Sequence, residues 1–147
     1  MATVSRRCKA PGSVVWQVLA DPWMYPSWVV GASRLRDVEG SWQQAGARIH
    51  HSVGAWPLLL DDHTEVVESH APTELTLQAK GRPLGEALVV MRVDDDGDGS
   101  LITMDETIVR GPGATLPDSV VDPLIAWRNT EALRRLGLIA EGRAGER

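Results

Sequence analysis

Residues 119–141, SVVDPLIAWRNTEALRRLGLIAE, form the longest helical pattern in this sequence. Asp122 and Pro123 have the residue types preferred at a helix cap and at the first helical position. An α-helix turns by about 100° per residue, which places several apolar side chains of this segment on one stripe. They are those of Val121, Ile125, Ala132, Leu136 and Ile139, with Leu124 at the edge of the stripe. Such a helix must bury its stripe against a second layer of structure, which the rest of the chain has to supply.

The segment before this helix has the period of β-strands. Leu75, Leu77 and Ala79 alternate with polar residues, which is typical of a sheet with one buried face. Turn-forming residues separate six such segments, which we predict as strands over residues 34–39, 47–53, 62–68, 75–80, 86–93 and 101–110. The short links between consecutive strands favour an antiparallel meander.

The N-terminal segment adds one strand and two short helices. Residues 3–9 alternate loosely and are predicted as a strand. Pro11 then introduces a short helix that ends near Ala20, and residues 24–28 form one further helical turn, interrupted by Pro26. The predicted class is therefore α+β, with a curved antiparallel sheet of about seven strands wrapped around a long C-terminal helix. A curved sheet that grips one helix leaves space between them, where small apolar ligands bind.

The composition fits one domain and excludes several functions. The 147 residues are 43% apolar and 24% charged, so we assign one domain to residues 1–141 and a frayed tail to residues 142–147. No apolar run approaches the ~20 residues that cross a bilayer, and no secretory signal pattern is present. A formal charge of −5 makes the chain a poor binder of nucleic acid. The lack of a long apolar run therefore predicts no stable membrane insertion. Cys8 is the only cysteine, which excludes an internal disulfide and fits a reducing compartment, so we expect a cytoplasmic protein.

Short motifs, in the order of the predicted elements, resemble those of a known superfamily. They are Ala10-Pro11, Val15-Trp16, Leu19-Ala20-Asp21, Tyr25-Pro26-Ser27-Trp28-Val29, Gly31, Arg82-Pro83-Leu84-Gly85-Glu86-Ala87, Met104-Asp105-Glu106, Gly111-Pro112, Trp127-Arg128-Asn129, Glu131 and Leu133-Arg134-Arg135-Leu136. The sequence is similar to START-like, polyketide-cyclase-type proteins of the SRPBCC superfamily, which have the helix-grip fold. This resemblance covers nearly the whole chain and implies a hydrophobic cavity between the sheet and the C-terminal helix. Because that superfamily has no universal catalytic motif, the resemblance assigns no catalytic residue, and we predict no cofactor.

Glu106 and Arg128 are the leading candidates for acid–base or ligand-orienting chemistry. Glu106 shares one face of the last predicted strand with apolar residues, Met104 among them, so its carboxylate is expected to face the interior. Arg128 interrupts the apolar stripe of the C-terminal helix and is expected to face the same interior. Since buried charges need partners, we expect the two to meet directly or through water. They then act either as a ligand-orienting and proton-accepting pair or as a structural ion pair.

The histidines and an acidic turn are further candidates. His50 and His51 are adjacent in a predicted strand, so only one of them can face a cavity, and we include His50 in the site. The turn DDDGDG at residues 94–99 resembles the start of an EF-hand calcium loop. Its flanking residues are typical of strands rather than helices, so we predict a hairpin turn there and no metal site.

The chain has six tryptophans and no phenylalanine, so tryptophan supplies most of its large rings. Trp16 and Trp127 lie on predicted helices, where core packing explains them. Trp28 lies beside the proline-containing turn, and Trp56 lies in the apolar connection WPLLL at residues 56–60. Tryptophans in such positions usually cover a cavity mouth, a neighbouring subunit or another hydrophobic partner.

These observations predict binding of a small hydrophobic molecule, such as a lipid, a polyketide or an aromatic metabolite. The residues expected to contact it are Trp28, His50, Trp56, Met104, Glu106 and Arg128. Two alternatives stay open. One is a cyclase or aromatase that uses the same cavity, with Glu106, Arg128 and His50 as candidate catalytic residues. The other is a module that binds a hydrophobic partner, which includes a homodimer.

Overall fold

The computed structural model describes residues 1–29, 32–40, 44–53, 60–81 and 85–145. In chain order, their elements are β1 (Ala2–Cys8), α1 (Gly12–Leu19), η1 (Pro22–Met24), α2 (Tyr25–Trp28), β2 (Ala32–Glu39), β3 (Arg48–Val53), β4 (Leu60–His70), β5 (Glu74–Gly81), β6 (Gly85–Asp96), β7 (Gly99–Arg110), η2 (Pro112–Thr115) and α3 (Asp118–Gly145). The predicted α+β helix-grip fold is confirmed, since short helices follow the first strand and one long helix follows the last.

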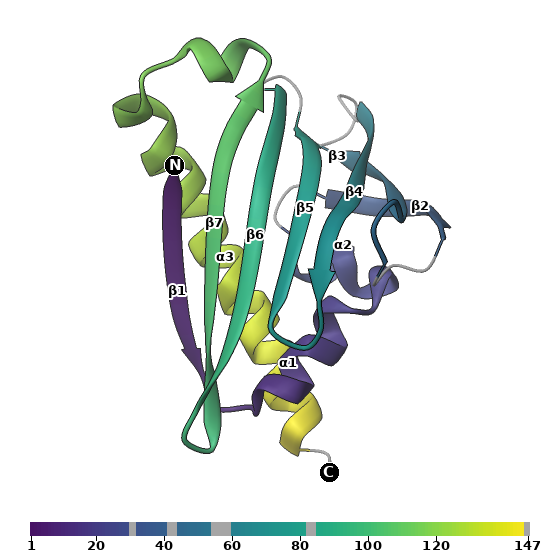
Figure 1. The fold of residues 1–147 in the computed structure, drawn as a ribbon, viewed down its shortest axis with the longest axis vertical. Coiled ribbons are helices and arrows are strands. Elements are labelled where there is room, and N and C mark those ends of the chain that lie inside the picture. Colours follow the sequence, from purple (N-terminus) through teal and green to yellow (C-terminus); the bar gives the residue numbers. More distant parts are fainter. Residues whose placement is uncertain (30–31, 41–43, 54–59, 82–84, 146–147) are drawn as a thin grey trace.

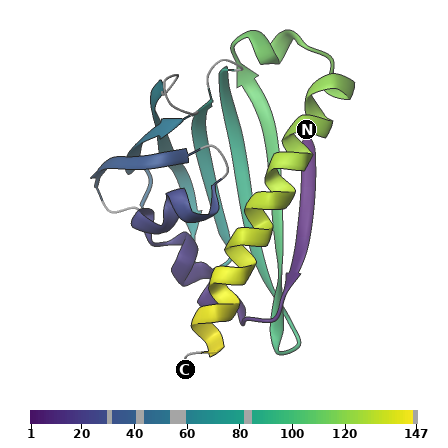
Figure 2. The same ribbon diagram turned by 180° about the vertical axis from the view of Figure 1, so that it is seen from behind.

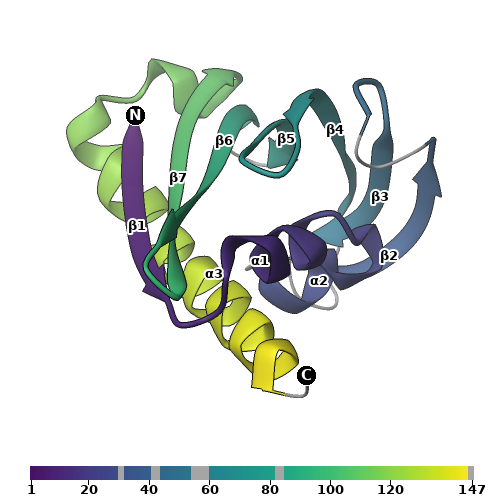
Figure 3. The same cartoon turned by 60° about the horizontal axis from the view of Figure 1, so that its bottom comes forward.

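The strands form one sheet in the order β1-β7-β6-β5-β4-β3-β2 (Figure 1). Strands β2 to β7 each pair antiparallel with their neighbours in sequence, as a meander does, and β1 pairs antiparallel with β7. Register shifts between Val66 and Glu68 and between Glu86 and Ala87 mark irregularities of the kind that bend strands. Figure 3 shows the curved sheet with α1, α2 and α3 on its concave side.

Helix α3 runs diagonally across the concave side of the sheet (Figure 2). Its buried residues are Val121, Ile125, Asn129, Ala132, Leu133, Leu136, Gly137 and Ala140. Ile139 is partly buried and packs against the core. The predicted apolar stripe is therefore confirmed, and the concave face of the sheet is the layer that buries it.

The start of α3 lies one residue before the predicted segment 119–141, but the predicted cap is wrong. The helix begins at Asp118 because the Pro117 carbonyl accepts hydrogen bonds from the Val120 and Val121 amides, at 2.9 Å and 3.2 Å. Pro123, which the sequence suggested as the first helical residue, lies inside the helix.

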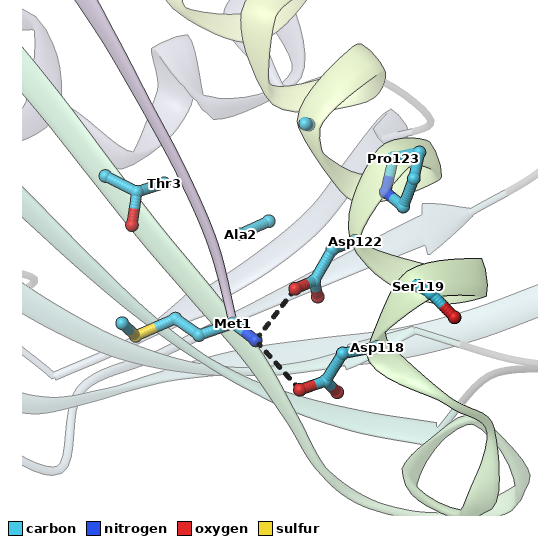
Figure 4. A pocket seen from close by; sticks show the side chains of 8 residues that line it. Met1, Ala2, Thr3, Asp118, Ser119, Asp122 and Pro123 are labelled. Atoms are coloured by element: carbon cyan, nitrogen blue, oxygen red, sulfur yellow. Dashed lines mark hydrogen bonds and ion pairs between the residues drawn. The ribbon is translucent and has the colours of Figure 1, made fainter.

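Asp122, the expected cap, has another role. Its carboxylate lies 3.1 Å from the N-terminal ammonium of Met1, and that of Asp118 lies 3.8 Å from the same group (Figure 4). The start of β1 is thereby tied to the first turns of α3 by a cluster of opposite charges.

The C-terminal end of α3 also differs from the prediction. The helix continues to Gly145, whereas the sequence suggested an end at residue 141 followed by a frayed tail. Two contacts explain the extension: Ala144 packs against the core, and Arg143 Nη2 lies 3.9 Å from Asp21 Oδ2. Tertiary packing therefore stabilises the last turn of α3, although the small and charged residues of this segment do not by themselves favour a helix.

The acidic turn joins β6 to β7, as predicted. Asp96 pairs with Gly99 across the ladder, and Gly97 has φ +61°, the left-handed conformation that a tight hairpin needs. The core lies between the concave face of the sheet and the helices, and its fully buried side chains include Leu19, Met91, Ile102 and Leu136. Across the described ranges, we find no helix long and apolar enough to cross a membrane.

Candidate functional site

Glu106 lies on the inner face of β7, between the sheet and α3. Its side chain is almost fully buried, and the residue is 4% exposed. The guanidinium of Arg128 on α3 donates a short hydrogen bond to Glu106 Oε2. The two residues that the sequence singled out are therefore in direct contact, and they join helix to sheet. Arg128 keeps 36% of its side chain exposed, so it spans from the interior to the surface.

Asn129 completes the hydrogen bonding of the carboxylate. Its amide Nδ2 donates to Glu106 Oε1 at 3.1 Å, so each carboxylate oxygen accepts a bond from α3. Asn129 is buried, and it is not among the site residues predicted from the sequence. The sequence carries a signal for this residue, because an asparagine on the buried face of an amphipathic helix is as unusual as the neighbouring arginine.

Tyr25 and Thr64 form a second buried polar contact near this carboxylate. Tyr25 is the first residue of α2, and its hydroxyl lies 3.0 Å from Thr64 Oγ1 on β4. Burial raises the pKa of Tyr25 to about 12, the hydrogen bond to Thr64 opposes this shift, and the negative charge of Glu106 adds to it. Three elements far apart in sequence, α2, β4 and β7, thus bring polar groups to one interior region.

Trp28 and Met104 supply apolar surface beside these groups. The Trp28 ring packs edge-on against Tyr25, with centroids 5.6 Å apart and planes 67° apart. Both Trp28 and Met104 are buried, and Met104 lies two residues before Glu106 on the same face of β7. The Trp28 Nε1 atom is buried and has no hydrogen-bond partner among the described residues. A buried hydrogen-bond donor without a partner lowers the stability of the folded state by about 1–3 kcal/mol. Trp28 Nε1 is therefore the unusual polar atom of this cluster.

The structure separates His50 from this group. In the register of β3 and β4, Ile49 pairs with Thr64 and His50 pairs with His63. Ile49 and Thr64 are fully buried, so His50 points to the opposite face of the sheet. There its Nε2 lies 3.2 Å from Glu39 Oε2, and its ring centroid lies 6.0 Å from that of His63. Trp56, the remaining candidate, lies outside the described residues.

Comparison with known proteins identifies the family. The model of the family described as polyketide cyclase / dehydrase and lipid transport matches residues 1–141. The chain belongs to this family. A search of curated proteins finds no match.

Solved structures with the same fold are distant in sequence. The structure of Ara h 8.0201 has a TM-score of 0.73 at 12% identity, over 94% of this chain and 95% of that one. CalU16 from Micromonospora echinospora has a TM-score of 0.66 at 16% identity, over 94% of this chain and 74% of that one. A protein from Rhodobacter sphaeroides has a TM-score of 0.71 at 21% identity, over 93% and 89%. At these identities the likeness establishes the helix-grip fold of this family member.

The surface pockets lined by described residues include three that lie outside the buried cluster, and one of them shares Arg128 with it. One lies beside the N-terminus and the start of α3 (Figure 4). A second lies between the end of β1 and the β6–β7 turn. The third lies on the outer side of α3, beside Trp127, and includes Arg128. Arg128 is therefore the residue that connects the buried cluster to a hollow on the surface. Trp127 is 76% exposed, so the expectation that core packing explains this residue is wrong.

The raised pKa of Tyr25 gives a test of this geometry. Tyr25 is the chain's only tyrosine, so the ultraviolet absorbance of tyrosinate reports it directly. The pKa of Tyr25 in the folded protein should be about 12 instead of the ordinary tyrosine value of 10.0, because the buried hydroxyl resists ionisation. Because the unfolded chain ionises first, stability is complete below pH 10 and declines as the pH rises toward 12, by roughly 2–3 kcal/mol.

Denaturation in urea at a series of pH values measures that decline. Tyr25→Phe is the matched control and should lose this pH dependence. A wild-type titration midpoint near 10 in the folded protein would show that the hydroxyl is solvated.

Proposed function

We propose that this family member binds a small hydrophobic molecule on the concave side of its sheet, against Trp28, Met104 and the inner face of α3. The molecule belongs to the class of lipids, polyketides and aromatic metabolites. The family's description as polyketide cyclase / dehydrase and lipid transport supports this class. The buried apolar side chains of Trp28 and Met104, with a few polar groups beside them, have the composition that ligand sites share.

The observation that carries the proposal is the buried indole N–H of Trp28, which has no hydrogen-bond partner among the described residues. A bound carbonyl, hydroxyl or ether oxygen would satisfy this donor and recover the free energy that its burial costs. The proposed ligand is therefore an apolar molecule that carries at least one oxygen acceptor. Arg128, which reaches from the interior to the surface, is placed to attract an acidic group on such a ligand.

The hydrogen bonds that Glu106 already accepts favour a binding function over a catalytic one. A proton acceptor for aldol closure or dehydration needs a free carboxylate oxygen within reach of the substrate. Both oxygens of Glu106 already accept hydrogen bonds from α3. The cyclase alternative requires the Asn129 or Arg128 contact to open, and turnover of a model poly-carbonyl substrate tests it directly.

Ligand binding is tested with mass spectrometry and a fluorescent probe. Native mass spectrometry after mild extraction should show a co-purified small molecule. The probe 1-anilinonaphthalene-8-sulfonate, which is aromatic and carries oxygen acceptors, should bind and quench tryptophan fluorescence. Trp28→Phe keeps an aromatic ring but removes the N–H, so it should weaken probe binding about tenfold, the value of one buried hydrogen bond.

Trp23→Phe is the matched control, because it makes the same change at a tryptophan that is 64% exposed. Its affinity for the probe should equal that of the wild type. Equal affinity of Trp28→Phe and wild type would remove Trp28 from the site. An extract without a ligand, together with no probe binding up to about 1 mM, would overturn the proposed function.

A further inference from the structure

A hollow on the surface lies where the end of β1, the β6–β7 turn and the C-terminal half of α3 come together. Figure 1 shows the end of β1 beside that turn. The hollow has a volume of about 650 Å³, and its lining includes Arg6, Cys8, Lys9, Asp98, Gly99 and Glu141. None of these residues belongs to the buried cluster around Glu106, so this hollow is a separate feature of the molecule.

Arg6 is a partly buried cation in this hollow. Burial alternates along β1, and Arg6 lies on the same inner side of the strand as the buried residues Ala2 and Cys8. Among the residues that the structure describes, its buried Nε has no hydrogen-bond partner and its guanidinium forms no ion pair. A buried donor without a partner costs about 1–3 kcal/mol, and more when it is charged. The hollow therefore contains a donor that a ligand can satisfy.

Helix α3 restricts where the Arg6 side chain can lie. A Cβ atom at Gly137 would lie 3.1 Å from Arg6 Nε and 3.4 Å from Arg6 Cδ, so the arginine packs closely over this glycine. Glycine in a helix interior costs about 1 kcal/mol relative to alanine, and here its small size admits the arginine. A guanidinium that is already packed in one place loses little conformational freedom when it binds a ligand.

Two further cations line the hollow. Lys9 is exposed and adds its ammonium group. Arg7 also contributes to the lining, but its Nε lies 3.0 Å from Asp96 Oδ2, so this arginine is already paired. Arg6 and Lys9 are therefore the cations that a ligand would meet.

Two carboxylates of the lining limit the charge of such a ligand. Glu141 Oε2 accepts a hydrogen bond from the Lys9 amide at 2.8 Å, and Asp98 is an exposed residue of the β6–β7 turn. Both carboxylates repel a second negative charge on the ligand. The hollow thus favours an anion with one charge over an anion with two.

We propose that this hollow binds a small organic carboxylate with a single negative charge, whose oxygens accept hydrogen bonds from Arg6. The planar fork of a guanidinium matches the two oxygens of a carboxylate. The ammonium of Lys9 adds attraction, and the volume of the hollow leaves room for the organic part of the ligand. This site is distinct from the apolar site proposed above, and either can exist without the other.

The side-chain Nε–H signal of Arg6 in ¹⁵N NMR spectra of the full chain provides a direct test. Acetate, added at constant ionic strength, should shift this signal to saturation with a Kd of roughly 1–10 mM. Acetamide has the same shape without the charge and should leave the signal in place. Inorganic phosphate at mildly alkaline pH, where it carries more charge, should bind severalfold more weakly than acetate.

Arg6→Gln should weaken acetate binding at least about tenfold, because it removes charged hydrogen bonds. In this variant the backbone amide signals of Cys8 and Lys9 report binding. Arg6→Lys keeps the charge without the fork and should also bind more weakly than the wild type. The matched control is Arg110→Gln, which makes the same change at an exposed arginine at the opposite end of β7 and should leave the affinity unchanged.

Four results would overturn the proposal. They are an Arg6 Nε–H signal that acetate does not move, an equal shift with acetamide, phosphate binding as tight as that of acetate, and an Arg6→Gln protein with wild-type affinity. None of these results bears on the binding of an apolar molecule beside Trp28, which the fluorescent probe measures separately.

Discussion

Glu106→Ala should lower the free energy of unfolding by about 3 kcal/mol, which makes it one of the most damaging single changes in the chain. The substitution removes the acceptor of two hydrogen bonds and leaves the buried amide of Asn129 without its partner. Breaking a buried ion pair costs about 3–5 kcal/mol, and we expect the lower end because Arg128 is 36% exposed and regains water. Chemical denaturation monitored by tryptophan fluorescence measures the loss.

Two further variants separate the contributions to this loss. Glu106→Gln keeps an oxygen for Asn129 and removes the charge, so it should cost less than Glu106→Ala, about 1–2 kcal/mol. The double variant Glu106→Leu with Arg128→Met removes both charges and should recover most of the stability, since apolar replacement of a buried pair is often nearly neutral. A Glu106→Ala protein as stable as the wild type would mean that the interior around this carboxylate is hydrated.

Leu136→Ala should cost about 2–5 kcal/mol of unfolding free energy. Leu136 is 0% exposed and lies where α3 packs on the concave face of the sheet, so truncation leaves a cavity between two rigid layers. Neighbouring backbone cannot close such a cavity without moving the helix.

Leu138→Ala provides the matched control on the same helix. Leu138 is 48% exposed, so the identical chemical change should stay within about 0.5 kcal/mol of the wild type. The two variants are compared in the same urea titration. Similar losses for both would mean that α3 does not bury the side that contains Leu136.

The fold was predictable because apolar and polar residues alternate along its strands, and apolar residues recur at helical spacing along its last helix. The inner face of β7, for example, follows from the alternation of Ile102, Met104 and Glu106, and the same pattern placed Glu106 inside. The ends of α3 were not predictable in this way. Pro123 has the residue type of a helix start, but it lies inside α3, where the neighbouring Asp122 pairs with Met1. At the other end, Arg143 lies near Asp21, and the helix continues beyond the predicted end at residue 141.

The site was predictable where a polar residue interrupts an apolar pattern, as Glu106 and Arg128 do. Thr64 could not be found this way, because β4 is polar along much of its length and its alternation is hidden. The side of the sheet that His50 takes depends on the register of β3, which places Ile49 inside. Two adjacent histidines carry no signal that fixes this choice, since a shift of one residue exchanges the faces.

The pairing of β1 with β7 has a consequence for the order in which the molecule forms. Ala2 lies opposite Glu106, so β1, which is made before the other strands of this sheet, finds its partner only after β7 has been made. Contacts between such distant segments require closure of a long loop and slow folding. The meander from β2 to β7 has short-range contacts and is able to form earlier. We therefore expect the N-terminal strand and α3 to close the structure together, as its last step, and a nascent chain that stops before β7 to expose β1.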